Sequence, residues 1–176
     1  MIKRYTRPEV EEIWLEKRKT ELWQLTELAV IQAKVKLGRL PGQIGQQICE
    51  ILSQTPIDLE YWHEKEAEIK HDLEAFLEER RRHLPAELQI HIHADDMTSF
   101  DTEESPFVGM LRDSVEVVDA AYMALAEVIK GLAQKYRYTL MMGRTHGQEA
   151  ELQTFGKRCL AWFADLSVAR EARGKI

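Results

Sequence analysis

Residues 110–136 read MLRDSVEVVDAAYMALAEVIKGLAQKY. Apolar side chains recur in this stretch at alternating spacings of four and three, at Leu111, Val115, Val118, Tyr122, Leu125, Ile129 and Leu132. Such a seven-residue repeat is typical of a helix that packs lengthwise in a bundle. An amphipathic surface helix would show a broader and less regular stripe. The repeat therefore predicts a long bundle helix.

The rest of the chain also shows helical rather than alternating periodicity. It predicts helices over 8–37 with one interruption, over 43–53, over 59–84 with a break near 70–71, and over about 152–166. Thr6 and Asp58 are candidate N-caps, and Gly38 is a candidate C-cap. Residues 85–106 and 138–147 lack this periodicity and are predicted to be loops. The expected fold class is all-α.

Composition limits the classes of protein that the chain can represent. Its 176 residues, 44% hydrophobic and 31% charged, are typical of a soluble globular domain. No apolar stretch approaches the roughly 18 residues of a membrane span, and the N-terminus lacks the apolar segment of a signal peptide. The net charge of −6 argues against a nucleic-acid partner. Cys49 and Cys159 lie in helical patterns and predict free thiols in a reducing cytoplasm.

The sharpest local motif is MMGRTHG at residues 141–147. Two glycines permit unusual backbone angles and close approach to a ligand. Between them, Arg144 offers a rigid fork for a carboxylate or phosphate, next to Thr145, and His146 can exchange a proton near neutral pH. An ordinary loop with a solvated arginine and histidine explains the same residues.

Two further motifs combine groups that can bind an anionic ligand. Lys70, His71 and Asp72 are consecutive at an expected helix start, where the aspartate can cap the helix or orient the histidine. Thr98 and Ser99 offer hydroxyl groups to a carboxylate or phosphate. A charged helix surface and ordinary turn chemistry are the respective alternatives.

The remaining polar clusters have simpler explanations. Arg4 and Tyr5 can bind a phosphate, but a solvated terminus explains them equally. Residues 80–83 read RRRH at a helix C-terminus, where the helix dipole accounts for them. His91, His93, Asp95 and Asp96 carry groups that can ligate a metal. Nothing else supplies the remaining ligands at a recognised spacing, so neither a metal nor another cofactor is expected.

The order of these motifs resembles that of the adenylosuccinate lyases, a family of the fumarase/aspartase superfamily. MMGRTHG followed by TFG is the part most specific for the superfamily, and the Arg-Tyr and His-Asp pairs favour the adenylosuccinate branch. The resemblance covers essentially the whole chain and rests on Arg4-Tyr5, His71-Asp72-Leu73, Thr98-Ser99, residues 141–147 and Thr154-Phe155-Gly156.

The resemblance implies a β-elimination that breaks a C–N bond and releases fumarate. Its substrates would be adenylosuccinate, which gives AMP, and the succinyl-carboxamide ribotide of purine synthesis. His146 matches the acid that protonates the leaving nitrogen, and His71 matches a second active-site histidine that positions the substrate. The resemblance assigns substrate binding to Arg4, Tyr5, Lys70, Asp72, Thr98, Ser99, Arg144 and Thr145.

The resemblance also implies an architecture. Members of the family are cytoplasmic homotetramers around a large helical bundle, and each active site takes loops from three subunits. It divides this chain into an N-terminal helical domain, 1–107, that carries binding loops, and the start of the bundle, 108–176. The family's catalytic serine lies on a Ser-Ser-x-Met-Pro-x-Lys-x-Asn loop, and this sequence has no Ser-Ser pair. We therefore expect the front part of a longer enzyme, inactive alone.

Two positions depart from the family pattern. Asp96-Met97 precedes Thr98-Ser99, where Gly-Leu or Gly-Met is usual, and Glu149 replaces a histidine. An aspartate can alter the backbone turn or repel a substrate carboxylate. Two alternatives stay open on these grounds: a non-catalytic helical protein that keeps the family's loops and works by association, and another lyase of the superfamily.

Overall fold

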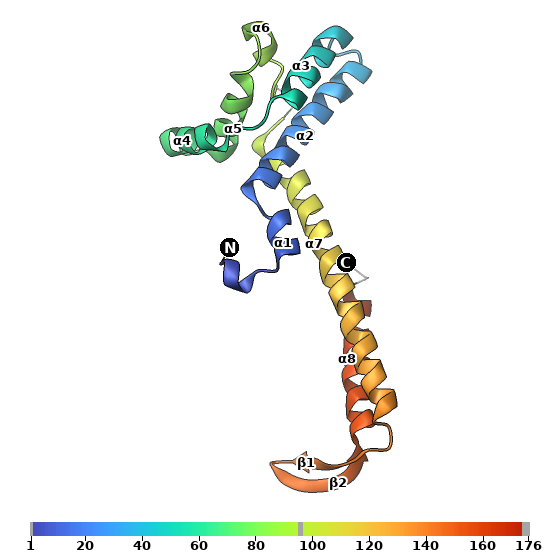
Figure 1. Cartoon of the computed structure of the whole chain (residues 1–176). Helices are drawn as coiled ribbons and strands as arrows, with labels where there is room; N and C mark the ends of the chain where they lie inside the picture. The colour runs from blue at the N-terminus through green and yellow to red at the C-terminus, as the bar shows by residue number, and fades with distance from the viewer. Residues whose placement is uncertain (1, 95–96, 174–176) are drawn as a thin grey trace. The chain divides into compact units, whose positions relative to one another are not determined.

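The computed structural model describes residues 2–94 and 97–173, and most of these are helical (Figure 1). This confirms the expected all-α class. The elements follow in the order η1 (Lys3–Tyr5), α1 (Pro8–Ile13), α2 (Glu16–Lys36), α3 (Gly42–Gln54), α4 (Leu59–Ile69), α5 (Asp72–Arg81), α6 (Ala86–Gln89), α7 (Ser99–Lys135), β1 (Leu140–Thr145), β2 (Gln148–Thr154) and α8 (Phe155–Arg173).

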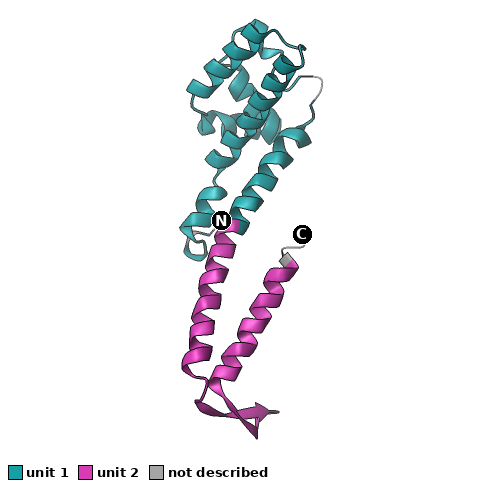
Figure 2. Cartoon of the chain, turned by 90° about the vertical axis from the view of Figure 1, so that its right-hand side faces the viewer, with its two compact units in different colours: residues 1–115 teal, residues 116–176 magenta. Residues whose placement is uncertain are grey.

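The chain divides into two compact units, Met1–Val115 and Glu116–Ile176 (Figure 2). The helix α7 contributes residues to both. In the described residues, no helix has the length and apolar character needed to cross a membrane.

The core of the first unit is formed mainly by α2, α3, α4 and α5. Trp23 of α2 makes edge-to-face contacts with Trp62 and Phe76, at ring-centroid distances of 6.1 and 5.5 Å. Aromatic pairs in this geometry add about 0.5–1.5 kcal/mol each beyond their buried area. The other buried apolar residues of the cluster are Leu28, Ile31, Leu40, Ile48, Leu52, Leu73, Ala75, Leu77, Leu84, Leu88 and Ile92.

Local signals fixed most of the helix ends in this unit. Asp58 caps α4 by accepting a hydrogen bond from the Tyr61 backbone N–H at 3.1 Å, as expected. Gly38 follows α2 with a φ of 69°, which also matches the expectation. The N-cap assigned to Thr6 is wrong. Arg7 occupies that position, and the Thr6 hydroxyl instead donates to the Ile2 carbonyl.

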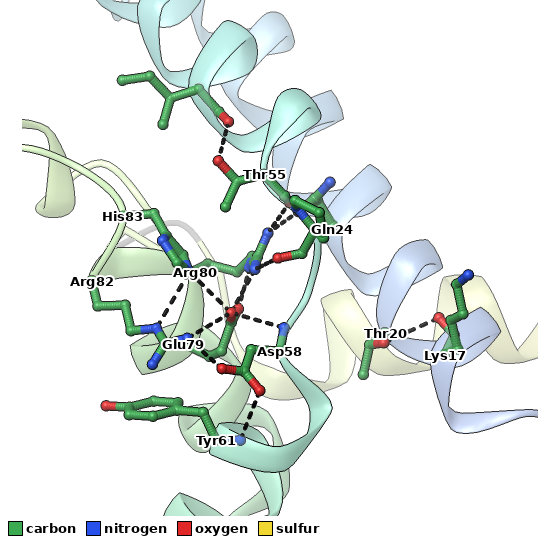
Figure 3. Close-up of polar contacts among 12 residues, drawn as sticks. Lys17, Thr20, Gln24, Thr55, Asp58, Tyr61, Glu79, Arg80, Arg82 and His83 are labelled. Atoms are coloured by element: carbon green, nitrogen blue, oxygen red, sulfur yellow. Dashed lines mark hydrogen bonds and ion pairs between the residues drawn. The ribbon is translucent and has the colours of Figure 1, made fainter.

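A buried ion pair joins α5 to the segment between α3 and α4 (Figure 3). Arg80 donates from Nη1 to Gln24 Oε1 at 2.8 Å and to the Thr55 carbonyl at 2.9 Å. Its Nη2 donates to the Pro56 carbonyl at 2.9 Å and to Glu79 Oε1 at 2.6 Å. The helix-dipole explanation of residues 80–83 is therefore wrong for Arg80, because its guanidinium is inside the protein.

The carboxylate of Glu79 has further donors. Its Oε1 accepts the Asp58 backbone N–H at 3.1 Å and lies 3.1 Å from His83 Nε2. Burial raises the pKa of Glu79, but hydrogen bonds from Arg80, the Asp58 backbone and His83, together with the charge of Arg80, outweigh this and leave the pKa below its ordinary value. The pair is thus held as two ions in the core.

The predicted loop over 85–106 is wrong at both ends. Helix α6 forms at Ala86–Gln89, and α7 already begins at Ser99, so that Pro106 lies inside the helix. A proline usually limits a helix because it lacks an N–H. Here Thr102 is buried and its hydroxyl donates to Glu27 Oε1 at 2.7 Å, and this tertiary contact holds the turn that precedes the proline.

The second unit contains a β-hairpin that the sequence did not predict. Strands β1 and β2 pair antiparallel, with Leu140 opposite Thr154 and Thr145 opposite Gln148. An irregularity in the register falls between Met142 and Arg144. The expected loop over 138–147 and the expected helix from about residue 152 are both corrected, because α8 begins at Phe155.

Helices α7 and α8 contact each other in the second unit. The Tyr122 hydroxyl donates to the Leu166 carbonyl, and Arg170 Nε lies 3.8 Å from Asp119 Oδ1. Cys159 of α8 is buried. The 37-residue length of α7 agrees with the long helix predicted by the heptad repeat. Several residues of the repeat are nevertheless 42–55% exposed in this chain: Leu111, Val115, Val118 and Leu125.

Candidate functional site

His146 occupies the tip of the hairpin. The paired residues Thr145 and Gln148 leave a two-residue turn, in which His146 has a φ of 52° and Gly147 a φ of 75°. A type I′ turn requires positive φ at both of these positions, and it matches the twist of the strands. Such a φ is uncommon for a residue with a side chain. The turn therefore presents an exposed imidazole in a narrowly defined backbone geometry.

Gly143 allows the two strands to approach each other behind this tip. A Cβ at this position would lie 2.7 Å from the Glu151 carbonyl oxygen. An open cavity of about 340 Å³ lies next to it and is lined by Gly143, Arg144, residues 150–153 and Lys157. Arg144 and Lys157 give this cavity two cationic groups, which suit an anionic ligand.

The TFG motif forms the junction between β2 and α8. Thr154 Oγ1 accepts the Lys157 backbone N–H at 3.1 Å and so caps α8. The backbone N–H groups of Phe155 and Gly156 donate to the carbonyls of Thr139 and Tyr136, at 2.8 and 3.0 Å. A Cβ on Gly156 would lie 2.6 Å from the Ala133 carbonyl and from Arg137 Cα. The motif is thus explained by backbone packing.

His71 lies at the break between α4 and α5. Lys70, with a φ of 58°, ends α4, and His71 is the N-cap of α5. Its Nδ1 accepts the Glu74 backbone N–H at 3.3 Å. A neutral imidazole that accepts at Nδ1 carries its hydrogen on Nε2. The sequence left open whether Asp72 caps the helix or orients the histidine. In the structure the cap is His71 itself, which leaves the Nε2–H of its exposed side chain as a donor.

Asp72 is held by groups from two other helices. Lys19 Nζ lies 3.5 Å from Asp72 Oδ2, and Trp62 Nε1 donates to the Asp72 carbonyl at 2.8 Å. The ammonium group of Lys19 lies 4.4 Å from the Trp23 ring centroid and 5.0 Å from that of Trp62, within cation–π range. These contacts fix the start of α5, where His71 stands.

Glu103 of α7 belongs to the same neighbourhood. Burial raises the pKa of its carboxyl, and the negative charge of Asp72 raises it further, while electrostatic interactions with His71 and Lys19 oppose the shift. We call Lys19, His71, Asp72 and Glu103 the α5 cluster. Ser99 lies one helical turn before Glu103 on α7. Glu103, on the helix that begins at Ser99, is therefore within electrostatic range of the His71-Asp72 pair.

The other candidate residues of the first unit do not belong to the α5 cluster. Thr98 is exposed just before α7, and its backbone N–H donates to Asp101 Oδ2 at 2.9 Å. Arg4 and Tyr5 are exposed in η1, with the guanidinium 4.8 Å from the ring centroid. Lys70 is also exposed.

The residues considered for a metal site are only partly described. Asp95 and Asp96, including the departure at Asp96, lie outside the described residues. His93 contacts Glu27, through Nδ1 and Oε1 at 2.9 Å. Within 2–94 and 97–173, no group of three or more His, Cys, Asp or Glu side chains could hold a metal ion.

The sequence did not identify Lys19 or Glu103. Both are ordinary charged residues of long helices, and only the ion pair of Lys19 with Asp72 and the electrostatic influence of Asp72 and His71 on Glu103 distinguish them. The spacing of Lys19 and Trp23, four residues apart on α2, was the one local signal available.

The family model described as Lyase matches residues 1–173. The adenylosuccinate lyase of Aquifex aeolicus is 34% identical over 174 residues, which cover 97% of this chain and 39% of that protein. The adenylosuccinate lyase of Synechocystis sp. is 34% identical over 167 residues, which cover 94% of this chain and 37% of that protein. The chain thus spans less than two-fifths of the length of these relatives.

Solved structures show the same fold. The 3-carboxy-cis,cis-muconate lactonizing enzyme of Pseudomonas putida superposes with a TM-score of 0.85 at 20% identity, over 97% of this chain and 40% of that one. A fumarate lyase from Mesorhizobium sp. BNC1 superposes with a TM-score of 0.83 at 21% identity, over 90% of this chain and 37% of that one. The chain therefore belongs to the Lyase family, as its motif order predicted, and it is similar to an N-terminal portion of the adenylosuccinate lyases.

Proposed function

We propose that the protein containing this chain is an adenylosuccinate lyase. It would cleave adenylosuccinate to AMP and fumarate, and release fumarate from the succinyl-carboxamide ribotide in the same way. The observation that carries the proposal is the α5 cluster, in which His71 offers an Nε2–H donor beside Asp72 and Lys19. The similarity to adenylosuccinate lyases at 34% identity supports it.

The reaction needs three kinds of group. A base removes a proton from the carbon beside a carboxylate, the C–N bond breaks, and an acid protonates the leaving nitrogen. Donors stabilise the negative charge that develops on the carboxylate. His146, exposed at the hairpin tip, serves as the acid, with Arg144 and Thr145 beside it as binding groups.

Binding is assigned to the remaining polar candidate residues. Thr98 and Ser99 hold the succinyl carboxylate, and His71 positions the substrate by its Nε2–H donor. The nucleotide is bound by Arg4, Tyr5, Lys70 and Asp72. The proposal includes no cofactor, and it places the protein in the cytoplasm as a homotetramer.

The base that the resemblance implies lies on a serine loop that these 176 residues do not contain. We therefore expect the 176-residue chain alone to release no fumarate from adenylosuccinate. The full-length protein that carries this segment should release it, followed by fumarate absorbance. A full-length protein that leaves adenylosuccinate intact would contradict the proposal, and so would robust turnover by the 176 residues alone.

A second candidate function is non-catalytic association. Glu149 stands opposite Arg144 in the hairpin register, in the place of a family histidine, and an acid there can engage the arginine that should bind substrate. A full-length protein that binds AMP but releases no fumarate would favour this candidate over the lyase.

A further inference from the structure

Glu27 of α2 is a buried acid that no part of the proposed chemistry uses. The residue is 3% exposed, yet its carboxylate has three donors. Oε1 accepts from the Thr102 hydroxyl at 2.7 Å and from His93 Nδ1 at 2.9 Å, and Oε2 accepts the His93 backbone N–H at 3.0 Å. A buried carboxylate is tolerated only when it is bonded in this way, so the arrangement is specific.

The two partners of Glu27 flank the proposed succinyl-binding hydroxyls. His93 precedes them in the sequence, and Thr102 follows them in the first turn of α7. Thr98 and Ser99 thus lie, in the sequence, between two residues that both bond one side chain of α2.

The backbone conformation of His93 indicates that its contacts with Glu27 hold it in place. Its φ of 51° lies in the left-handed region, which costs free energy for a residue with a side chain. Such a conformation persists only when its surroundings hold it, and here Glu27 bonds both the backbone N–H and the ring of His93.

We propose that Glu27 is a positioning residue that fixes Thr98 and Ser99 for binding of the succinyl group. The inference rests on the proposed function for the identity of the ligand. The geometric part, that Glu27 orders this segment, is independent of any activity. Glu27 itself is buried and does not touch the substrate in this proposal.

The geometric part is tested on the 176-residue chain by amide hydrogen exchange. Thr102→Val removes the hydroxyl at nearly constant shape, and Thr102→Ser keeps it as the matched control. We expect Thr102→Val to speed exchange of the amides at 98–103 about tenfold, since a buried acceptor loses a donor. Exchange in α5 should stay unchanged, as should exchange in Thr102→Ser. Equal rates at 98–103 in both variants would overturn the inference.

His93 provides a second, independent test. Asparagine tolerates positive φ and carries a side-chain amide N–H, so His93→Asn should keep the slow exchange at 98–103. His93→Ala removes the donor and disfavours the backbone conformation, so it should lose that protection. If both variants exchange alike, the anchor at His93 is refuted.

The ligand part is tested by steady-state kinetics of the full-length protein. Glu27→Gln keeps the shape of the side chain and weakens its charge-assisted bonds. We expect KM for adenylosuccinate to rise about tenfold, with a smaller change in kcat and an unchanged affinity for AMP, which lacks the succinyl group. An unchanged KM, or a loss of kcat alone in proportion to unfolded protein, would overturn the ligand part.

Failure of the proposed function and failure of the positioning role of Glu27 give different results. A wild-type full-length protein without lyase activity would refute the proposed function and, with it, the succinyl ligand. The exchange measurements on Thr102 and His93 decide separately whether Glu27 orders the segment.

Discussion

Arg80 and Glu79 are adjacent in the sequence and form an ion pair inside the protein, with Nη2 2.6 Å from Oε1 and side chains 2% and 0% exposed. Arg80 also donates to the carbonyls of Thr55 and Pro56, so the pair ties α5 to the α3–α4 connection. Two ions that are removed from water stabilise a fold only as a complete, hydrogen-bonded set. Removal of either side chain of the pair should therefore lower the free energy of unfolding.

Arg80→Met should destabilise the chain by about 3–5 kcal/mol, because it leaves the Glu79 carboxylate buried without its cation. Urea unfolding measures this change. Arg112→Met is the control, since the Arg112 side chain is 73% exposed and pairs with its neighbour Asp113 at 3.0 Å. It should cost about 0–1 kcal/mol. Equal losses in the two variants would contradict the role given to the pair.

Stability should fall in acid partly through Glu79. Its pKa in the folded chain lies below the ordinary value of 4.5, so the folded state favours the carboxylate. This contribution is fully present above pH 4.5 and is lost as the pH falls through the lowered pKa. In Glu79→Gln, unfolding free energy should decline less steeply below pH 4.5 than in the wild type. Parallel declines would show that other carboxylates account for the acid effect.

Gly156→Ala should destabilise the junction of β2 and α8 by about 1–3 kcal/mol, because the new methyl would meet the backbone of α7. Thermal unfolding measures the loss. Gly131→Ala is the matched control in the same unit: no heavy atom lies within 4 Å of its added Cβ, and alanine favours a helix interior by about 0.5–1 kcal/mol. A stabilised or neutral Gly156→Ala would contradict the close approach.

His146→Ala in the full-length protein should abolish turnover, with a loss in kcat of about 10²–10⁴ for a general acid, while nucleotide binding is largely kept. Fumarate release and AMP titration measure the two quantities. His63→Ala is a suitable control, because His63 is an exposed histidine of α4 that contacts Glu16 at 3.1 Å. Near-normal turnover of His146→Ala would refute the acid assignment.

Lys19→Met should raise KM in the full-length protein several-fold, because Asp72 loses the cation that fixes the start of α5. Its effect on stability should stay below about 1 kcal/mol, since the ion pair is partly exposed. Lys17→Met, two residues earlier with a side chain 74% exposed, should change neither KM nor stability measurably. A KM equal to the wild type in Lys19→Met would show that Asp72 needs no such support.

Elements with a local cause were predictable. The break at Lys70-His71, the Asp58 cap and the Gly38 helix end each depend on residues within one turn. The hairpin was missed although His146-Gly147 fills a type I′ turn. Residues 138–147 lack helical periodicity and indicate a loop, and the helical pattern that follows extends back to about residue 152. The start of α7 was misplaced because Pro106 was expected to end the preceding loop, whereas the contact of Thr102 with α2, a helix far away in the sequence, lets α7 begin before the proline.

The sequence by itself determined the all-α class, several helix ends, the family and a first set of candidate site residues. Helical periodicity and caps depend on residues that are close together in the sequence, and the order of motifs can be read from the sequence directly. Only the tertiary structure decided how those residues are held. Lys19 reaches Asp72 across 53 positions and Glu27 reaches Thr102 across 75. Contacts of this kind produce no periodic pattern in the sequence, since each depends on how separate helices pack and on which charges that packing removes from water.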